Sequence, residues 1–168
     1  MKQLLTLLLI CCSSVVMAQM QAAQRIIPEY THDTQIKSTP VKVWRVIRDL
    51  PQVKEYSNGT IKEVNIRTVG DTRYRDLVFA DGHKRTDEIE QVHEQYKFFV
   101  FHIQEPLPQG VTKAIVTALV ESAPNSDDVA VIRWSMIMEG DKSARKKLVD
   151  ILSAEIANYE AGLKKMLE

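Results

Sequence analysis

Two residues near the C-terminus, Glu155 and Tyr159, place a carboxyl and a phenol at a spacing that could do chemistry. In a helix, residues at i and i+4 are neighbours on the same face. At about 100° per residue, both fall within about 20° of the direction of Leu148, in the middle of an apolar stripe. A dry, unpaired carboxylate there would cost several kcal/mol, so the carboxyl of Glu155 must be paired, protonated or hydrated.

Several interpretations of Glu155 stay open at the level of the sequence. Together with Tyr159 it could orient the polar end of a ligand, or, with a raised pKa, it could act as a general acid or base. Alternatively, it pairs with a buried partner such as an arginine, or leans toward solvent at the edge of the stripe. No second convergent polar group is identifiable, so the sequence favours a polar anchor over catalysis.

The other titratable residues show no pattern typical of catalysis or metal binding. The histidines considered as metal ligands are His83, His93 and His102. They have neither HxH nor HExxH spacing, so no metal and no cofactor are expected. In the acidic segment 87–90, only Glu88 and Glu90 share a side of the strand, and both are expected to be solvated. No Ser-His-Asp order, glycine-rich phosphate loop or nucleotide fingerprint is present.

The element that positions Glu155 and Tyr159 is a long helix, predicted from Ala144 to Leu167. Its apolar residues recur at steps of three and four, and no proline interrupts it. A helix of this length needs a curved sheet to lie against. Period-two alternation predicts six strands, at Thr60–Val69, Thr72–Ala80, His83–His93, Tyr96–Gln104, Val111–Glu121 and Val129–Glu139. The polar strand His83–His93 is expected near an edge of the sheet.

One strand and two short helices are predicted before these six strands. The first extended segment is Ile26–Ile36. Thr39 supplies a capping hydroxyl and Pro40 begins a helix that runs to Leu50. A second short helix follows at Gln52–Tyr56. The fold class is therefore α+β, with a single domain over residues 19–168.

Two segments have more distinctive sequences. The first contains Ser38-Thr39-Pro40, Val43-Trp44, Ile47, Asp49-Leu50 and Tyr56; the second is Ala130–Met138, with Trp134 inside it. Both resemble the START-like, helix-grip superfamily, which includes polyketide cyclases and dehydrases, lipid-transfer domains and the birch-pollen allergen group. The first looks like its opening helix pair and the second like the strand that leads into the long helix. The resemblance implies a curved seven-stranded antiparallel sheet wrapped around the C-terminal helix, with a hydrophobic ligand between them.

Alternation predicts which side chains would face such a ligand. On the last two strands the wholly apolar sets should point toward the long helix. The predicted ligand-binding residues are Ala114, Ala118, Phe99, Phe101, Trp134, Met136, Leu152, Glu155, Ile156 and Tyr159. The two alanines leave room for a cavity. A filled core, with large residues opposite the alanines, is the alternative.

Residues 1–18 are predicted to be a secretory signal peptide. An apolar run, Leu4–Ile10, follows a basic start, and Val16-Met17-Ala18 offers a cleavage site before Gln19. The run is too short to span a bilayer, which disfavours a membrane anchor. A lipoprotein modified at Cys11 is the other alternative. Cleavage before Gln19 would leave no cysteine for thiol chemistry and would place the protein in the periplasm or outside the cell.

The charge balance and the candidate residues together rank the functions. The chain has 22 basic and 22 acidic residues and no basic stripe, so nucleic acid is not an expected partner. The leading prediction is an exported protein, without a stable membrane anchor, that binds an apolar small molecule or lipid. The alternatives are a cyclase- or dehydratase-type enzyme that uses Glu155 as acid or base, and an envelope protein-interaction module with an exposed apolar patch.

Overall fold

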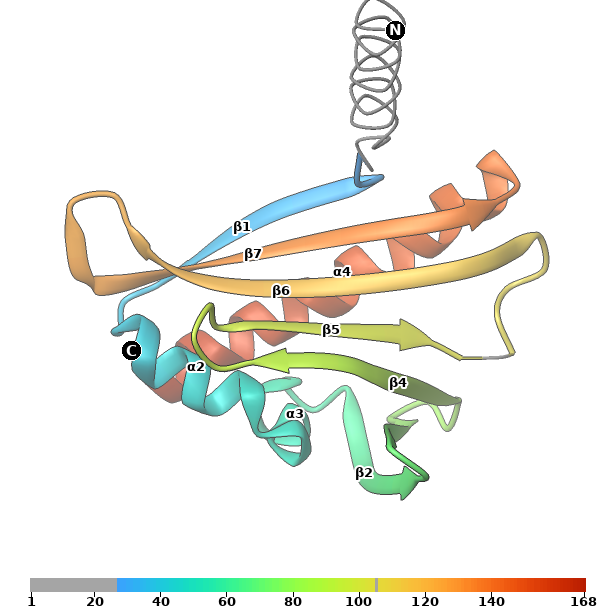
Figure 1. Cartoon of the computed structure of the whole chain (residues 1–168), viewed down its shortest axis with the longest axis horizontal. Helices are drawn as coiled ribbons and strands as arrows, with labels where there is room; N and C mark the ends of the chain where they lie inside the picture. Colours follow the sequence, from blue (N-terminus) through green and yellow to red (C-terminus); the bar gives the residue numbers. More distant parts are fainter. Residues whose placement is uncertain (1–26, 105) are drawn as a thin grey trace, which may run out of the picture.

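The computed structural model describes residues 27–104 and 106–168 (Figure 1). The chain forms seven strands: β1 (Tyr30–Ile36), β2 (Ile61–Val69), β3 (Thr72–Phe79), β4 (Lys84–His93), β5 (Phe98–Ile103), β6 (Val111–Ala123) and β7 (Ser126–Gly140). Its helical elements are α2 (Pro40–Arg48), the 3₁₀ turn η1 (Leu50–Gln52), α3 (Val53–Tyr56) and α4 (Lys142–Leu167). The predicted signal peptide and Ile26 lie outside the described residues.

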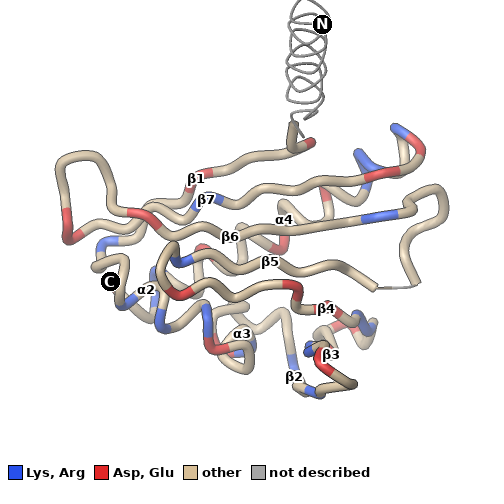
Figure 2. Tube along the Cα trace, in the orientation of Figure 1, with Lys and Arg blue, Asp and Glu red and all other residues tan. Residues whose placement is uncertain are grey.

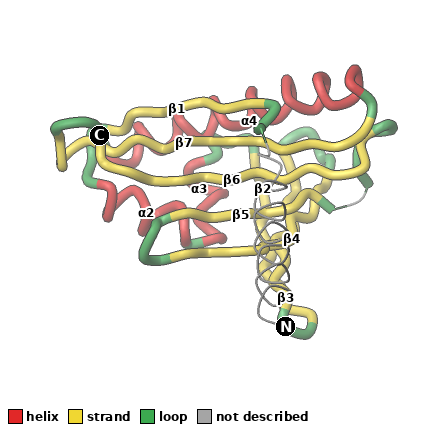
Figure 3. The backbone as a smooth tube through the Cα atoms, turned by 45° about the horizontal axis from the view of Figure 1, so that its top comes forward, coloured by secondary structure: helices red, strands yellow, loops and turns green. Residues whose placement is uncertain are grey.

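All seven strands form one antiparallel sheet in the order β1-β7-β6-β5-β4-β3-β2. α4 crosses one face of this sheet (Figures 1 and 3). The apolar core lies between this sheet face and the helices. The predicted α+β class, the seven antiparallel strands and the two short helices after the first strand are therefore confirmed.

The structure corrects three details of the predicted strands. β4 lies between β3 and β5, so it is not near an edge; the edges are β1 and β2. The polar residues of β4 suggested an exposed strand, but two of them, Arg85 and Asp87, form a hydrogen-bonded ion pair inside the molecule. β6 and β7 are each longer than predicted, so the turn between them is a tight hairpin with Asn125 at φ +62°.

A capping residue and a proline explain where α2 begins, and a backbone hydrogen bond fixes the position of the start of α4. The side chain of Thr39 accepts a hydrogen bond from the backbone N–H of Lys42, and Pro40 is the first residue of α2. α4 begins after Asp141, whose backbone N–H donates to the carbonyl of Gly110. This bond ties the start of α4 to the loop between β5 and β6, which borders the site described below.

α4 packs closely against α3 at Gly162. A Cβ atom at this position would overlap the carbonyl group of Tyr56, so only glycine allows the two helices to approach this far. Basic and acidic residues are interspersed along the described chain (Figure 2). Within residues 27–104 and 106–168, no helix has both the length and the apolar character needed to cross a bilayer.

Candidate functional site

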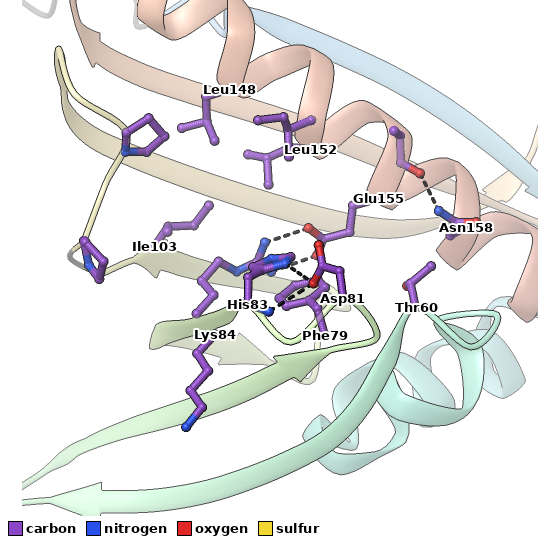
Figure 4. Close-up of a pocket in the computed structure, with 15 residues that line it drawn as sticks. Thr60, Phe79, Asp81, His83, Lys84, Ile103, Leu148, Leu152, Glu155 and Asn158 are labelled. Atoms are coloured by element: carbon purple, nitrogen blue, oxygen red, sulfur yellow. Dashed lines mark hydrogen bonds and ion pairs between the residues drawn. The ribbon is translucent and has the colours of Figure 1, made fainter.

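A pocket of about 480 Å³ opens between α4, the β3–β4 hairpin and the loop that follows β5 (Figure 4). This volume is typical of small-molecule sites. Its apolar lining consists of Phe79, Ile103, Pro106, Pro108, Leu148, Ile151, Leu152 and Ala154. Its polar lining consists of Thr60, Asp81, His83, Lys84, Arg85, Glu155 and Asn158.

A buried ion pair between Arg85 and Glu155 forms part of the pocket wall. Arg85 donates from Nη1 to Glu155 Oε2 at 2.6 Å and from Nη2 to Oε1 at 2.8 Å. Only 11% of the Arg85 side chain and 9% of the Glu155 side chain are exposed. The hydroxyl of Tyr159 donates to the same carboxylate from one turn further along α4. The predicted juxtaposition of Glu155 and Tyr159 is therefore present, and Glu155 has the arginine partner that the sequence left open.

A second buried ion pair adjoins the first. Arg85 Nε donates to Asp87 Oδ1 at 2.8 Å, and Arg75 Nη2 donates to Asp87 Oδ2 at 2.7 Å. Arg75 and Asp87 are almost completely buried. Guanidinium and carboxylate groups thus alternate in the order Arg75, Asp87, Arg85, Glu155. We call this set, together with Tyr159, the buried polar network; its charges sum to zero.

The strand register explains how β3 and β4 build this network. Arg85 and Asp87 are two residues apart on β4, so both point to the helix-facing side of the sheet. On β3, Arg75 lies directly opposite Asp87. Direct cross-strand partners share a face, which brings the guanidinium of Arg75 to the carboxylate of Asp87.

Aromatic rings surround the two buried guanidinium groups. The Cζ atom of Arg75 lies 4.9 Å from the ring centre of Phe101 and 5.3 Å from that of Phe99. The Cζ atom of Arg85 lies 5.3 Å from the ring centre of Phe79. The faces of these rings attract cations. Phe99 and Phe101, predicted as ligand-binding residues, thus pack against the network's cations.

The protonation states of Glu155 and Tyr159 follow from their partners. Burial alone would raise the pKa of Glu155, but the charge of Arg85 and the hydrogen bonds from Arg85 and Tyr159 lower it. Burial, together with repulsion from Glu155, holds the pKa of Tyr159 well above its ordinary value. Glu155 is therefore an ionised acceptor and Tyr159 a protonated donor. A general-acid role for Glu155 would require a raised pKa, whereas the pKa of Glu155 is lowered.

The predicted ligand-binding residues separate into two groups. Leu152 and Glu155 line the pocket. The other eight are buried and do not line it: Phe99, Phe101, Ala114, Ala118, Trp134, Met136, Ile156 and Tyr159. Ala118 lies directly between Phe99 and Trp134 in the sheet register. The large side chains on both sides compensate for the small size of Ala118, which favours the filled-core alternative.

Sequence reasoning missed Arg75, Arg85 and Asp87. The signal that was available is the requirement that Glu155 have a cationic partner, combined with the Arg-x-Asp spacing on β4. It also missed the contribution of the β3–β4 turn, from which Asp81 and His83 enter the pocket lining. Turn residues are solvent-exposed in most proteins, so nothing in the local pattern marked them.

Metal binding has no support from the side-chain arrangement. Over residues 27–104 and 106–168, no group of three or more His, Cys, Asp or Glu side chains is placed to hold a metal ion. The acidic side chains of β4 instead have hydrogen-bonding partners: Asp87 pairs with the two arginines, Glu88 accepts from Gln104 at 2.8 Å, and Glu90 lies 2.6 Å from His102.

Comparison with known proteins identifies the fold. No protein-family model and no curated protein matches the chain. Among solved structures, the XoxI protein of Bacillus cereus matches with a TM-score of 0.71 and 16% identity, covering 84% of this chain and 96% of that one. Norcoclaurine synthase of Thalictrum flavum, solved with dopamine and hydroxybenzaldehyde, matches with a TM-score of 0.63 and 19% identity over 82% of this chain and 84% of that one.

A third match, a protein of Nitrosospira multiformis, has a TM-score of 0.64 and 15% identity, and covers 80% of this chain and 94% of that one. These similarities extend over nearly all described residues. The chain therefore has the helix-grip fold of the START-like proteins, as the resemblance of residues 38–56 and 130–138 implied. Identities of this level establish the shared fold alone, so function has to be argued from the pocket.

Proposed function

We propose that this protein binds a small, mainly apolar and uncharged molecule in the pocket between α4 and the β3–β4 hairpin. The observation that carries the proposal is the composition of the lining. Eight apolar side chains, two of them prolines, are combined with a polar wall. Apolar walls with a few placed polar groups are typical of small-molecule sites.

The preference for an uncharged ligand follows from the electrostatics of the wall. Arg85 and Glu155 neutralise one another, and so do Arg75 and Asp87 beside them. At the mouth, the carboxylate of Asp81 is hydrogen-bonded to the backbone N–H and the ring of His83, and Lys84 extends away from the other labelled side chains in Figure 4. A charged ligand would lose its hydration without gaining an unpaired counter-ion, which is costly. Burial of apolar ligand surface, at about 25 cal/mol per Å², supplies the affinity.

The structural neighbours support a small-molecule ligand. Norcoclaurine synthase, with the same fold, has been solved with dopamine and hydroxybenzaldehyde bound. We propose that the ligand here is held on the helix-facing side of the sheet, where the pocket between α4 and the β3–β4 hairpin lies. The ten predicted residues then divide into direct contacts, Leu152 and Glu155, and a supporting shell that shapes the wall.

The test is a binding assay on two matched tryptophan variants of α4. Ala154 lines the pocket and is exposed, whereas Ala157 is also exposed and does not line it. The neutral apolar fluorophore N-phenyl-1-naphthylamine serves as probe. Ala154→Trp should weaken probe binding at least about tenfold, equivalent to about 1.4 kcal/mol, and Ala157→Trp should leave it within about twofold. Equal affinities in both variants would refute the pocket as the binding site.

We propose further that the protein is exported and acts in the periplasm or outside the cell. The proposal rests on the apolar run Leu4–Ile10 and the cleavage site before Gln19. N-terminal sequencing of the protein recovered from its native cells should give a chain that starts at Gln19. A chain that starts at Cys11 and carries a lipid would instead establish the lipoprotein alternative.

A further inference from the structure

We propose that His83, held by Asp81, is a general base that removes a proton from the carbon next to a carbonyl group of a neutral molecule bound in the pocket. This inference rests on the proposed function, because the base can act only on a molecule that the pocket binds. It assigns the acid–base chemistry to the mouth of the pocket. His83 and Asp81 line the same pocket as Glu155 and the α4 residues Leu148 and Leu152 (Figure 4).

The hydrogen bonds of Asp81 fix the tautomer of His83. Asp81 Oδ1 lies 2.6 Å from His83 Nδ1 and accepts the backbone N–H of His83 at 3.0 Å. These bonds lower the pKa of Asp81, so its carboxylate is ionised and can only accept. Nδ1 must therefore carry a hydrogen, and in the neutral imidazole that acts as the base the lone pair is then on Nε2. Among residues 27–104 and 106–168, His83 Nε2 has no hydrogen-bonding partner.

The turn holds the imidazole ring in a defined plane. The ring stacks on Phe79 with 3.9 Å between ring centres and an interplanar angle of 12°. The backbone N–H of Phe79 donates to the carbonyl of His83 at 2.9 Å, which closes the hairpin around Gly82 at φ +91°. A carboxylate that orients an imidazole through its Nδ1–H and leaves Nε2 free to accept a proton is the arrangement that makes histidine an effective base.

Arg85 supplies a donor for the negative charge that proton removal creates. A guanidinium has five N–H groups. Four of them are directed at Asp87 and Glu155, two from Nη2 and one each from Nε and Nη1. The remaining N–H of Nη1 has no hydrogen-bonding partner among the described residues, and in the proposed step it donates to the oxygen of the molecule bound in the pocket that Arg85 lines. A fixed, positively charged donor at a developing oxyanion stabilises the transition state.

The proton and electron balance of this step is simple. The C–H bond breaks and its proton goes to His83 Nε2. The electron pair forms the carbon–carbon double bond of an enolate, and the carbonyl oxygen takes up the negative charge and accepts the hydrogen bond from Arg85. The negative charge of the Asp81 carboxylate offsets the positive charge of the imidazolium that forms. Return of a proton from Nε2 to carbon regenerates the ketone, so no oxidant or co-reactant is required.

The experiment measures the exchange of deuterium into 2-tetralone, a neutral apolar ketone, by ¹H NMR in D₂O. His83→Gln should slow the exchange at least about 100-fold, because a positioned base contributes about 10²–10⁴-fold. Asp81→Asn should slow it about tenfold, because the tautomer is no longer fixed. His102→Gln is the matched control. Like His83, His102 has one ring nitrogen 2.6 Å from a carboxylate oxygen, in its case Nε2 and Glu90, and it does not line this pocket.

A separate binding measurement distinguishes failure of the base from failure of the pocket. The same ketone is titrated against bound N-phenyl-1-naphthylamine in wild type and His83→Gln. Probe displacement with equal exchange rates in both proteins would overturn the role of His83 and leave the binding function standing. Exchange by wild type no faster than by free imidazole at the same concentration would overturn it as well. A protein that binds neither probe nor ketone would refute both proposals.

Discussion

Removal of the Glu155 carboxylate tests whether the Arg85–Glu155 pair is a true buried ion pair. In Glu155→Leu, the guanidinium of Arg85 loses both bonds to Oε1 and Oε2 and shares Asp87 with Arg75. Two buried cations then face one buried anion. Breaking a buried pair in this way typically costs about 3–5 kcal/mol, a large part of the 5–15 kcal/mol that stabilises an ordinary domain.

The companion variants identify the origin of that loss. Arg85→Met alone should also destabilise by about 3–5 kcal/mol, because it leaves Glu155 buried without a cation. The double variant Arg85→Met/Glu155→Leu removes both charges and keeps the pair of Arg75 and Asp87 intact. Its stability should lie within about 2 kcal/mol of wild type, so the coupling between the two positions should exceed about 3 kcal/mol.

Urea unfolding provides the measurement. With a slope of about 2 kcal/mol per M for a domain of this size, a loss of about 4 kcal/mol moves the midpoint by about 2 M. A Glu155→Leu variant destabilised by less than about 1 kcal/mol would refute the buried-pair reasoning. So would strictly additive effects in the double variant, because independent side chains have no coupling energy.

Three further variants test other parts of the molecule. Folding lowers the pKa of Glu155, so the stability that its charge contributes is complete above the unfolded pKa, about 4.3, and is lost as the pH falls through the folded pKa. The difference in unfolding free energy between wild type and Glu155→Gln, measured by urea titration, should therefore narrow between pH 6 and pH 3. A difference that stays constant would contradict this. Gly162→Ala should lower the melting temperature by several degrees, since the new Cβ meets the Tyr56 carbonyl, whereas an unchanged value would mean that α3 can move away freely. Ala118→Phe should cost at least about 1–3 kcal/mol by overpacking between Phe99 and Trp134; a neutral effect in urea would reveal a void there.

The order of elements could be predicted from the sequence because each one carries its own local signal. Thr39-Pro40 marks the start of α2, period-two alternation marks the strands, and an uninterrupted apolar stripe marks α4. Glu155 was also recognisable, because a carboxyl in the middle of an apolar stripe violates the pattern around it. Violations of this kind depend on one element only, so the sequence of that element is sufficient to detect them.

The position of β4 and the extent of the pocket could not be predicted in the same way. Arg85 and Asp87 resemble solvent-facing residues of an edge strand, because a strand's polarity does not show whether its polar groups face water or one another. Only the cross-strand register, with Arg75 opposite Asp87, settles that question. The same holds for Ala118: its size suggested empty space, and its flanking positions Phe99 and Trp134 become known only when three strands are aligned.

The buried polar network has a consequence for function that its stability alone does not explain. Well-packed apolar residues of similar volume often replace a buried ion pair without loss of stability, so stability gives little reason to keep Arg85 and Glu155. Their place in the pocket wall gives one: they add a hydrogen-bond donor to an otherwise mainly apolar lining without adding net charge. The double variant Arg85→Met/Glu155→Leu should accordingly fold and bind N-phenyl-1-naphthylamine at least as tightly as wild type, and lose most of its ability to accelerate deuterium exchange into 2-tetralone. Retained exchange in that variant would mean that the network only supports the fold.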